Sequence, residues 1–347
     1  ARLGIINLRV ITMNVLMVES HYRSRSWFEA LKDLANLHII SMLGEERRLF
    51  LSNGIPENKI LNLHNPDLNR IKYEEALNSL TKYEKKYNFL ANQIVLTDRT
   101  LRRKDIEYIT KYLYFLIQQI EEFISKNHIK VVFIEPTWTH EILICKICKT
   151  MDIPVWALQK SKLMPNKFFF FSGYKNEVSF NRNSSKNLDV LGEELLGFLE
   201  KKEKPQYFEK YNRRSKLTWS KFNVLYDITK LALLRDKNYN IQPSWIYAVK
   251  KKLGALLRAK FLMHQIKFYK TEEVKRPYIL VTLHVQPEAS IDVVGEKFAD
   301  QVNFVRSICR TTPAKYTIAV KEHSHAYGDR DLTFYRKLSE LPNVNLI

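Results

Sequence analysis

The fold of this chain is constrained most strongly by short apolar runs that alternate with longer stretches of helical spacing. Residues 14–20, 131–134 and 278–283 are such runs, rich in aliphatic and β-branched side chains. Runs of this length and composition are typical of strands buried on both faces. Strands that alternate with helices predict an α/β fold with a parallel, doubly wound sheet.

The first 175 residues repeat this alternation and predict one N-terminal α/β lobe. We expect strands at residues 14–20, 38–42, 60–63, 131–134 and 155–158, and helices at 27–35, 45–53, 73–90, 101–126 and 138–151. The four-phenylalanine run within residues 167–171 favours a further buried strand or an aromatic plug over a ligand-stacking surface.

Residues 176–276 lose the strand pattern and predict a helical linker region between two lobes. The chain carries a formal net charge of +19, and residues 201–276 hold 20 Lys and Arg against 6 Asp and Glu. Aromatic residues, including Trp219 and Trp245, are interleaved with these cations. A basic segment of this kind attracts anionic partners, so we expect it to contact the anionic surface of a membrane.

The strand–helix alternation resumes at residue 277. We expect strands at residues 278–283, 316–320 and 344–347, and helices at 298–310 and 331–340. Residues 277–347 therefore predict the start of a second, C-terminal α/β lobe. Because this stretch is shorter than most domains, we expect the second lobe to be incomplete in this chain.

Several classes of protein are disfavoured by motifs that the sequence lacks. It has no G-x-G-x-x-G and no P-loop motif, which argues against a dinucleotide dehydrogenase and a P-loop NTPase. The 3 cysteines argue against a disulfide framework, and Cys145 and Cys148 lie in an apolar helical stretch that favours buried core thiols. No apolar run is long enough to span a bilayer, and no residues have clear metal-ligand spacing. We expect a cytoplasmic protein that uses no metal.

Polar side chains follow the predicted strands at the points where these strands end. His284, Gln286 and Glu288 come after residues 278–283, and the run Lys321, Glu322, His323 comes after residues 316–320. Open α/β sheets bind ligands beyond the carboxyl ends of their strands. These six side chains are therefore candidate ligand contacts of the second lobe.

The first lobe repeats the pattern at two of its strand ends. Glu19 lies at the end of residues 14–20 and His21 follows them, and Glu135 and Thr137 follow residues 131–134, with His140 in the helix beyond. A carboxylate in this place can act as a general base or can cap the next helix. Glu135 is our first candidate for a base and Glu19 our second, with His21, Thr137 and His140 as contacts of an acceptor.

Four segments of the C-terminal part carry a resemblance to a known family. They are LHVQPEAS (283–290), DQVNFVRSI (300–308), KEH (321–323) and FYRKLSELPNVNLI (334–347). Together they resemble the capsule polysaccharide biosynthesis family of bacterial glycosyltransferases, which is related to capsule Kdo transferases. The opening NVLMVESH (14–21) is compatible with it. The family continues its KEH with proline, whereas Ser324 follows His323 here.

The resemblance implies a GT-B architecture of two Rossmann-like lobes, with the acceptor on the first lobe and the sugar nucleotide on the second. It implies an inverting transfer without metal or other cofactor, with Lys321 and His323 at the phosphate and Gln286 and Glu288 at the base or sugar. His284 and Glu322 would add donor contacts. The donor would be a CMP- or UDP-linked sugar, and the acceptor an oligosaccharide or lipid-linked surface polysaccharide at the inner face of the cell membrane.

Two other functions remain open on the sequence. A sugar-nucleotide 2-epimerase would use the same two-lobed fold without an acceptor. A nucleic-acid-binding protein would account for the basic charge, but the sequence has no helix-turn-helix, RNP or zinc pattern, so we expect no nucleic-acid partner.

Overall fold

The computed structural model describes a mixed α/β protein with two compact units, each built on a parallel sheet. It describes residues 13–19, 25–160, 168–175, 178–179, 192–193, 196–197, 200, 250–251, 253–255, 257–259, 263–323 and 326–347. The described residues up to 200 form the first unit, and those from 250 onward belong to the second. The predicted fold class is therefore confirmed in each unit.

The first unit contains a seven-stranded sheet in the order β3-β2-β1-β4-β5-β6-β7. The strands are β1 (Asn14–Glu19), β2 (Asn36–Ser41), β3 (Ile60–Asn62), β4 (Val131–Ile134), β5 (Val155–Lys160), β6 (Phe168–Ser172) and β7 (Val178–Ser179). The first five are parallel, and β6 and β7 join antiparallel at the β5 edge. This order is that of a doubly wound nucleotide-binding sheet.

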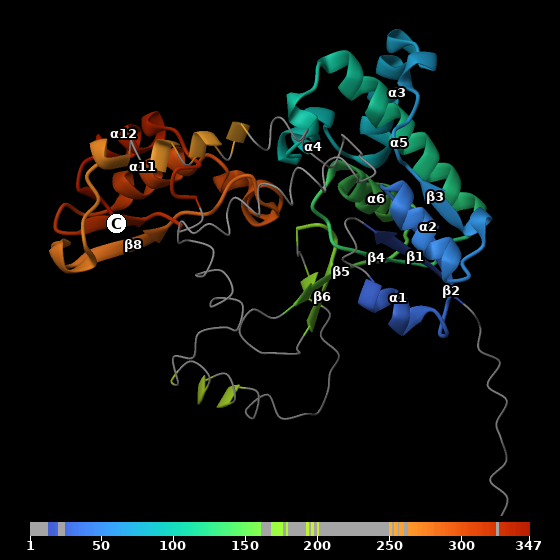
Figure 1. The fold of residues 1–347 in the computed structure, drawn as a ribbon, viewed down its shortest axis with the longest axis horizontal. Helices are drawn as coiled ribbons and strands as arrows, with labels where there is room; N and C mark the ends of the chain where they lie inside the picture. The colour runs from blue at the N-terminus through green and yellow to red at the C-terminus, as the bar shows by residue number, and fades with distance from the viewer. Residues whose placement is uncertain are drawn as a thin grey trace, which may run out of the picture. The chain divides into compact units, whose positions relative to one another are not determined.

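Helices cover both faces of this sheet (Figure 1). They are α1 (Arg25–Leu31), α2 (Gly44–Ser52), α3 (Tyr73–Tyr87), α4 (Ala91–Thr97), α5 (Ile106–Lys126) and α6 (Thr139–Thr150). Phe28 of α1 and Phe50 of α2 pack together on the face that carries Met17. On the opposite face, Phe123 of α5 packs edge-on against His38. Apolar side chains on both sides explain why β1 and β2 consist almost wholly of buried residues.

The chain reverses its winding direction at β1, which pairs with β2 on one side and β4 on the other. Along β1 and β4, Met17 lies opposite Phe133, so Glu19 and Glu135 follow two residues later on neighbouring strands. The carboxyl edge at such a reversal is where open α/β sheets form their ligand crevice. Glu19 and Glu135 therefore flank the topological switch point of the first sheet.

The phenylalanine run forms β6, and a strand was one of the two structures predicted for it. This strand is not fully buried. Phe169 is 47% exposed, whereas Phe170 packs edge-on against Phe133. Because β6 lies outside the parallel part of the sheet and pairs antiparallel, alternate side chains face different surroundings.

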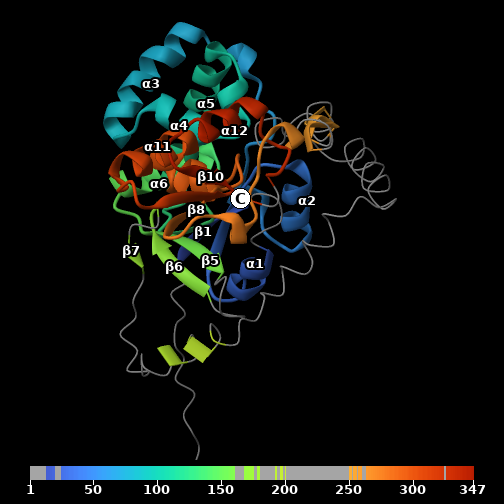
Figure 2. The same cartoon turned by 90° about the vertical axis from the view of Figure 1, so that its left-hand side faces the viewer.

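The second unit contains a three-stranded parallel sheet in the order β10-β9-β8, with two helices on one face (Figures 1 and 2). Its strands are β8 (Tyr278–Thr282), β9 (Thr317–Lys321) and β10 (Val344–Leu346), and its helices are α11 (Gln301–Thr311) and α12 (Leu332–Ser339). Val281, Val320 and Tyr335 are buried in the core between the sheet and the helices. The sequence predicted a fully buried β8, but Leu280 is 51% exposed because β8 is an edge strand of the described sheet.

The second unit includes residues before 277, although the sequence predicted that it starts at residue 277. Ile266 is buried in its core, Phe268 packs edge-on against Tyr335, and the Tyr269 amide donates to the Leu346 carbonyl at 2.7 Å. The described residues 263–276 thus pack with the second sheet. Most of the predicted linker, including residues 201–249, lies outside the described residues.

A network of polar side chains lies at the amino ends of β1, β2 and β3. The Asn36 side chain donates to Asn14 at 2.6 Å and accepts from the Lys59 ammonium at 2.5 Å. The neighbouring His38 is 3% exposed, and among the described residues its Nδ1 has no hydrogen-bond partner. Burial, followed by the charge of Lys59, lowers the pKa of His38 to about 4.

We expect acid to destabilise the first unit through His38. Unfolded His38 takes up a proton below pH about 6.5, whereas folded His38 does so only near pH 4. The free energy of unfolding should therefore fall by about 2 to 3 kcal/mol as the pH drops through this window. His38→Phe should flatten the dependence, measured by urea unfolding at pH 7 and 4.5.

His128→Asn is the matched control, because His128 is exposed and Asn tolerates its φ of 48°. This variant should keep the pH dependence of the parent. If His38→Phe is as acid-sensitive as the parent, His38 does not cause the loss.

Candidate functional site

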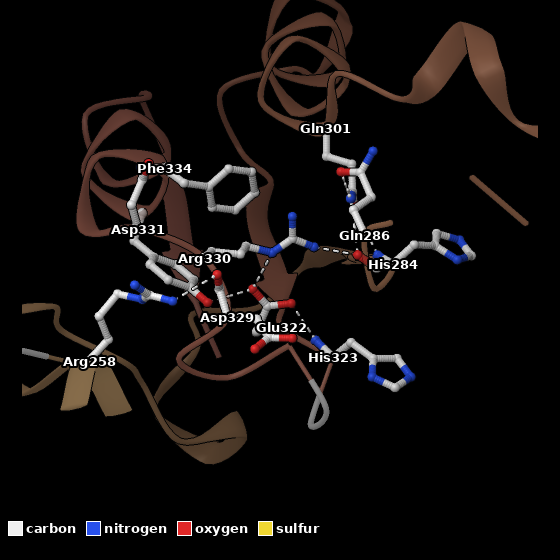
Figure 3. A network of polar contacts seen from close by, with 11 residues as sticks. Arg258, His284, Gln286, Gln301, Glu322, His323, Asp329, Arg330, Asp331 and Phe334 are labelled. Carbon is white, nitrogen blue, oxygen red and sulfur yellow. Dashed lines mark hydrogen bonds and ion pairs between the residues drawn. The ribbon is translucent and has the colours of Figure 1, made fainter. Parts of the chain in front are cut away.

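The carboxyl edge of the second sheet carries two histidines, one after each of two neighbouring strands. β8 and β9 are paired with Thr282 opposite Lys321, and His284 and His323 each come two residues after this pair. Both histidines are exposed, while Leu283 between Thr282 and His284 is buried. Figure 3 shows both imidazoles projecting to the same side, away from the helices. We call His284, His323 and Lys321 the paired-histidine site.

Glu322 points inward from the same strand end. Its Oε2 accepts hydrogen bonds from Arg330 Nε at 2.9 Å and from the Tyr335 hydroxyl at 2.8 Å, and its Oε1 accepts from the His323 amide at 2.7 Å. The Glu322 side chain is 5% exposed. Burial, followed by Glu322, raises the pKa of Tyr335, so its hydroxyl stays protonated and donates. The predicted contact of Glu322 with a donor is untested, and its carboxylate is occupied within the protein.

Arg330 is the ion-pair partner of Glu322, and no sequence motif predicted this role. Its guanidinium pairs with Glu322, donates through Nη2 to the His284 carbonyl, and lies 4.3 Å from the ring centroid of Phe334 (Figure 3). The one sequence signal was a cation just before the predicted helix 331–340. Nothing in the sequence identified its partners, which lie 8 and 46 residues away.

Gln286 and Gln301 hold the loop that follows β8. The Gln286 amide donates to Asp292 at 3.0 Å and to the Ala299 carbonyl at 2.9 Å, and its oxygen accepts from Gln301 at 2.7 Å. Gln301, 3% exposed, accepts from the His284 amide and donates to the His284 carbonyl. The Gln286 side chain is therefore committed to the loop, and its predicted contact with a base or sugar is untested.

The remaining predicted donor residues face outward. Glu288 is exposed and its carboxylate accepts from the Ser290 hydroxyl at 3.0 Å. Lys321 is exposed, and among the described residues its ammonium has no ion-pair or hydrogen-bond partner. Beside the Glu288 carboxylate, the outer surface of this edge thus presents two imidazoles and one ammonium, groups that can donate hydrogen bonds to an anion.

In the first unit, buried carboxylates hold the loops at the strand ends. Glu46 accepts from the Met42 and Leu43 amides at the start of α2, and Glu141 accepts from the Thr137 and Trp138 amides at the start of α6. These amides lie at helix starts, where they lack partners within the helix. The carboxylates satisfy them, so they fix the loops after β2 and β4.

Asp98 is the most heavily bonded of these carboxylates. Its Oδ1 accepts from the amide and hydroxyl of Thr100 and from the Leu101 amide, at 2.9 to 3.0 Å. Its Oδ2 accepts from the amide and hydroxyl of Thr139, at 3.0 and 2.8 Å. Asp98 therefore joins the end of α4 to the start of α6 beside the switch point.

The first-unit residues predicted for catalysis and acceptor binding differ in accessibility. Glu135 is exposed, whereas Glu19 is 1% exposed. Thr137 is 7% exposed and donates its hydroxyl to Glu141, and His140 is 2% exposed. His21 lies outside the described residues. The roles predicted for all of them stay predictions, and the geometry makes Glu135 the most accessible.

Other predicted features concern metals, thiols and membranes. Within the described ranges, no three His, Cys, Asp or Glu side chains are grouped to hold a metal ion. Burial raises the pKa of Cys148 to about 12 and that of Cys145 well above its usual value, as in core thiols. No helix in the described part of the chain has the length and apolar character to cross a bilayer.

Comparison with known proteins gives no family assignment. No protein-family model matches the chain, and no curated protein matches it. Among solved structures, the chain is similar to a UDP-GlcNAc 2-epimerase from Methanocaldococcus jannaschii, with a TM-score of 0.26 and 11% identity over 97% of this chain and 73% of that one. It is also similar to the UDP-GlcNAc 2-epimerase from Neisseria meningitidis bound to UDP-GlcNAc, with a TM-score of 0.23 and 12% identity over 96% and 72%. Similarity this distant leaves the function to be argued from the chain's own residues.

We expect Asp98→Asn to destabilise the first unit by about 2 to 4 kcal/mol. The N–H groups of the Asn amide would face the buried N–H and O–H groups that now donate to Asp98. Urea unfolding measures the loss. Asp105→Asn is the matched control: Asp105 is an exposed N-cap that accepts from the Tyr108 amide, and Asn caps equally well. Equal urea midpoints for the two variants would show that the hydrogen bonds of Asp98 do not stabilise the first unit.

Proposed function

We propose that the paired-histidine site binds the phosphates of a nucleotide sugar. The observation that carries this proposal is the placement of two exposed histidines, His284 and His323, on neighbouring strand ends, with Lys321 on the same outer surface. Two imidazoles and an ammonium can donate hydrogen bonds to phosphate oxygens, and the ammonium of Lys321 supplies positive charge. Arg330 balances the charge of the inward Glu322, so that carboxylate repels an approaching anion less.

We further propose that the protein is a glycosyltransferase. It would move a sugar from a CMP- or UDP-linked donor to an oligosaccharide or a lipid-linked surface polysaccharide of the capsule or lipopolysaccharide type. Residues 283–290, 300–308, 321–323 and 334–347, which resemble segments of the capsule polysaccharide biosynthesis family, support this class. Cationic side chains at the leaving phosphate can stabilise its developing charge without a metal.

Glu135 would be the base in this reaction. Transfer needs a group that takes the proton of an acceptor hydroxyl. Glu135 is exposed at the switch point of the first sheet, whereas Glu19 on the neighbouring strand is buried and would serve only after a rearrangement.

The basic stretch 201–276 would hold such an enzyme at an anionic membrane, where a lipid-linked acceptor resides. Its support is the excess of Lys and Arg over Asp and Glu. Each cation near an anionic surface contributes about 1 kcal/mol. Binding to anionic but not to neutral vesicles, weakened by salt, is the expected behaviour.

Removing either imidazole should weaken nucleotide binding. We expect His284→Ala and His323→Ala each to raise the Kd for the tightest-binding of CMP, UDP, GDP and TDP by about tenfold, which corresponds to about 1.4 kcal/mol for one lost charge-assisted hydrogen bond. Isothermal titration calorimetry measures this. His264→Ala, an exposed histidine of the same unit outside the site, should leave the Kd unchanged. Affinities equal to that of the parent in both site variants would overturn the assignment.

Glu135→Gln should abolish transfer and leave nucleotide affinity intact, because the amide keeps the shape of the side chain and loses the basic oxygen. Transfer of radiolabelled sugar to an oligosaccharide acceptor measures the rate, and we expect a loss of at least about 100-fold. An unchanged rate would exclude Glu135 as the base. If the C2 epimer of the donor sugar forms without any acceptor, the protein is instead a sugar-nucleotide 2-epimerase.

A further inference from the structure

Behind the paired-histidine site, one arginine joins the two loops that carry the histidines. We propose that Arg330 is a positioning residue, whose guanidinium fixes the separation of the His284 and His323 imidazoles so that both contact one phosphate-bearing ligand. The inference deepens the proposed function and rests on it, since the separation matters only if both rings serve the same ligand.

The connection runs through very few bonds. Arg330 Nη2 donates to the His284 carbonyl, Arg330 Nε donates to Glu322 Oε2 at 2.9 Å, and Glu322 Oε1 accepts from the His323 amide at 2.7 Å. The regular ladder between β8 and β9 ends with the Leu283 amide donating to the Lys321 carbonyl at 2.8 Å. Among the described residues, no backbone hydrogen bond joins the two loops beyond that point. Arg330 and Glu322 thus continue the connection where the ladder stops.

Only an arginine fits this place. Its planar guanidinium donates in two fixed directions and stacks on an aromatic ring, whereas a lysine offers one mobile point charge. Here one donor reaches the loop after β8, another reaches Glu322, and the guanidinium carbon lies 4.3 Å from the Phe334 ring centroid. The Arg330 and Glu322 side chains are 9% and 5% exposed, so little water competes for these bonds.

Arg330 is itself held by the turn that precedes it. Arg258 Nε donates to the Gly328 carbonyl at 2.7 Å, and Arg258 Nη2 approaches the Asp329 carbonyl at 3.4 Å (Figure 3). Gly328 has a φ of 84°, and a Cβ there would lie 2.4 Å from the Ala255 carbonyl oxygen. The turn therefore needs glycine, both for its conformation and for the close approach of Ala255.

The test compares Arg330→Lys, Arg330→Ala and Tyr335→Phe with the parent. The probe is the nucleotide that the parent binds most tightly among CMP, UDP, GDP and TDP, titrated by calorimetry. We expect both arginine variants to raise the Kd at least tenfold. Tyr335→Phe removes another hydrogen bond to the same Glu322 carboxylate and leaves the Arg330 bonds in place, so its Kd should stay within about twofold of the parent.

Chemical rescue separates positioning from loss of folding. Guanidinium at low millimolar concentration should restore most of the affinity of Arg330→Ala, because it can occupy the vacated place between Glu322 and the His284 carbonyl. It should not restore His284→Ala. If Arg330→Ala does not fold, the Kd of Arg330→Lys alone tests whether Arg330 positions the two histidines.

A distant variant tests the same chain of contacts without altering a group near the ligand. Gly328→Ala should weaken nucleotide binding at least threefold, because its methyl group displaces the turn that holds Arg330. Gly54→Ala is the matched control: Gly54 has the same φ of 84°, but a Cβ there would meet nothing within 4 Å.

The ligand-free protein gives an independent readout. In NMR spectra, Arg330→Lys should shift the ring signals of both His284 and His323, and Tyr335→Phe should leave them in place. A parent that binds none of the four nucleotides contradicts the proposed function, while the ring signals still report on Arg330. Parent-like affinity and unshifted signals in Arg330→Lys would overturn the positioning inference.

Discussion

The ion pair between Glu322 and Arg330 is the interaction on which the site of the second unit depends. Side chains alternate along β9, so Lys321 and His323 face outward and Glu322 faces inward. A buried carboxylate without a partner would be costly, and Arg330 and Tyr335 supply that partner. The same contacts hold the loop after β8, since Arg330 also binds the His284 carbonyl. The contacts among Glu322, Arg330 and Tyr335 thus stabilise the second unit and also hold the loops that carry His284 and His323.

The first unit uses buried carboxylates in the same way at its own carboxyl edge. Asp98, Glu46 and Glu141 accept from amides at the starts of helices or turns and so fix the loops around the switch point. Of the two described carboxylates at the ends of β1 and β4, Glu135 is exposed and Glu19 is buried. In both units, acidic side chains near strand ends are mainly structural, and the exposed neighbours are the candidates for chemistry.

The sequence predicted the strands well and the partners of polar side chains poorly. β4 begins and ends at the predicted residues, because a short apolar run between polar neighbours is typical of a buried strand. The inward direction of Glu322 follows from the two-residue period of a strand and was within reach of the sequence. The roles of Arg330 and Gln301 were not, because their partners lie at distant positions in the chain and are chosen by packing. For the same reason Gln286 looked like a ligand contact, although its amide is bonded within its own loop.

In the proposed function, the phosphate of one bound nucleotide contacts two histidines on neighbouring strand ends. A crystal structure with the tightest-binding of CMP, UDP, GDP and TDP is the most direct test. We expect phosphate oxygens within hydrogen-bond distance of both the His284 and His323 rings, with Lys321 nearby and the Arg330–Glu322 pair unbroken. A nucleotide bound elsewhere, or phosphates that contact neither ring, would contradict it.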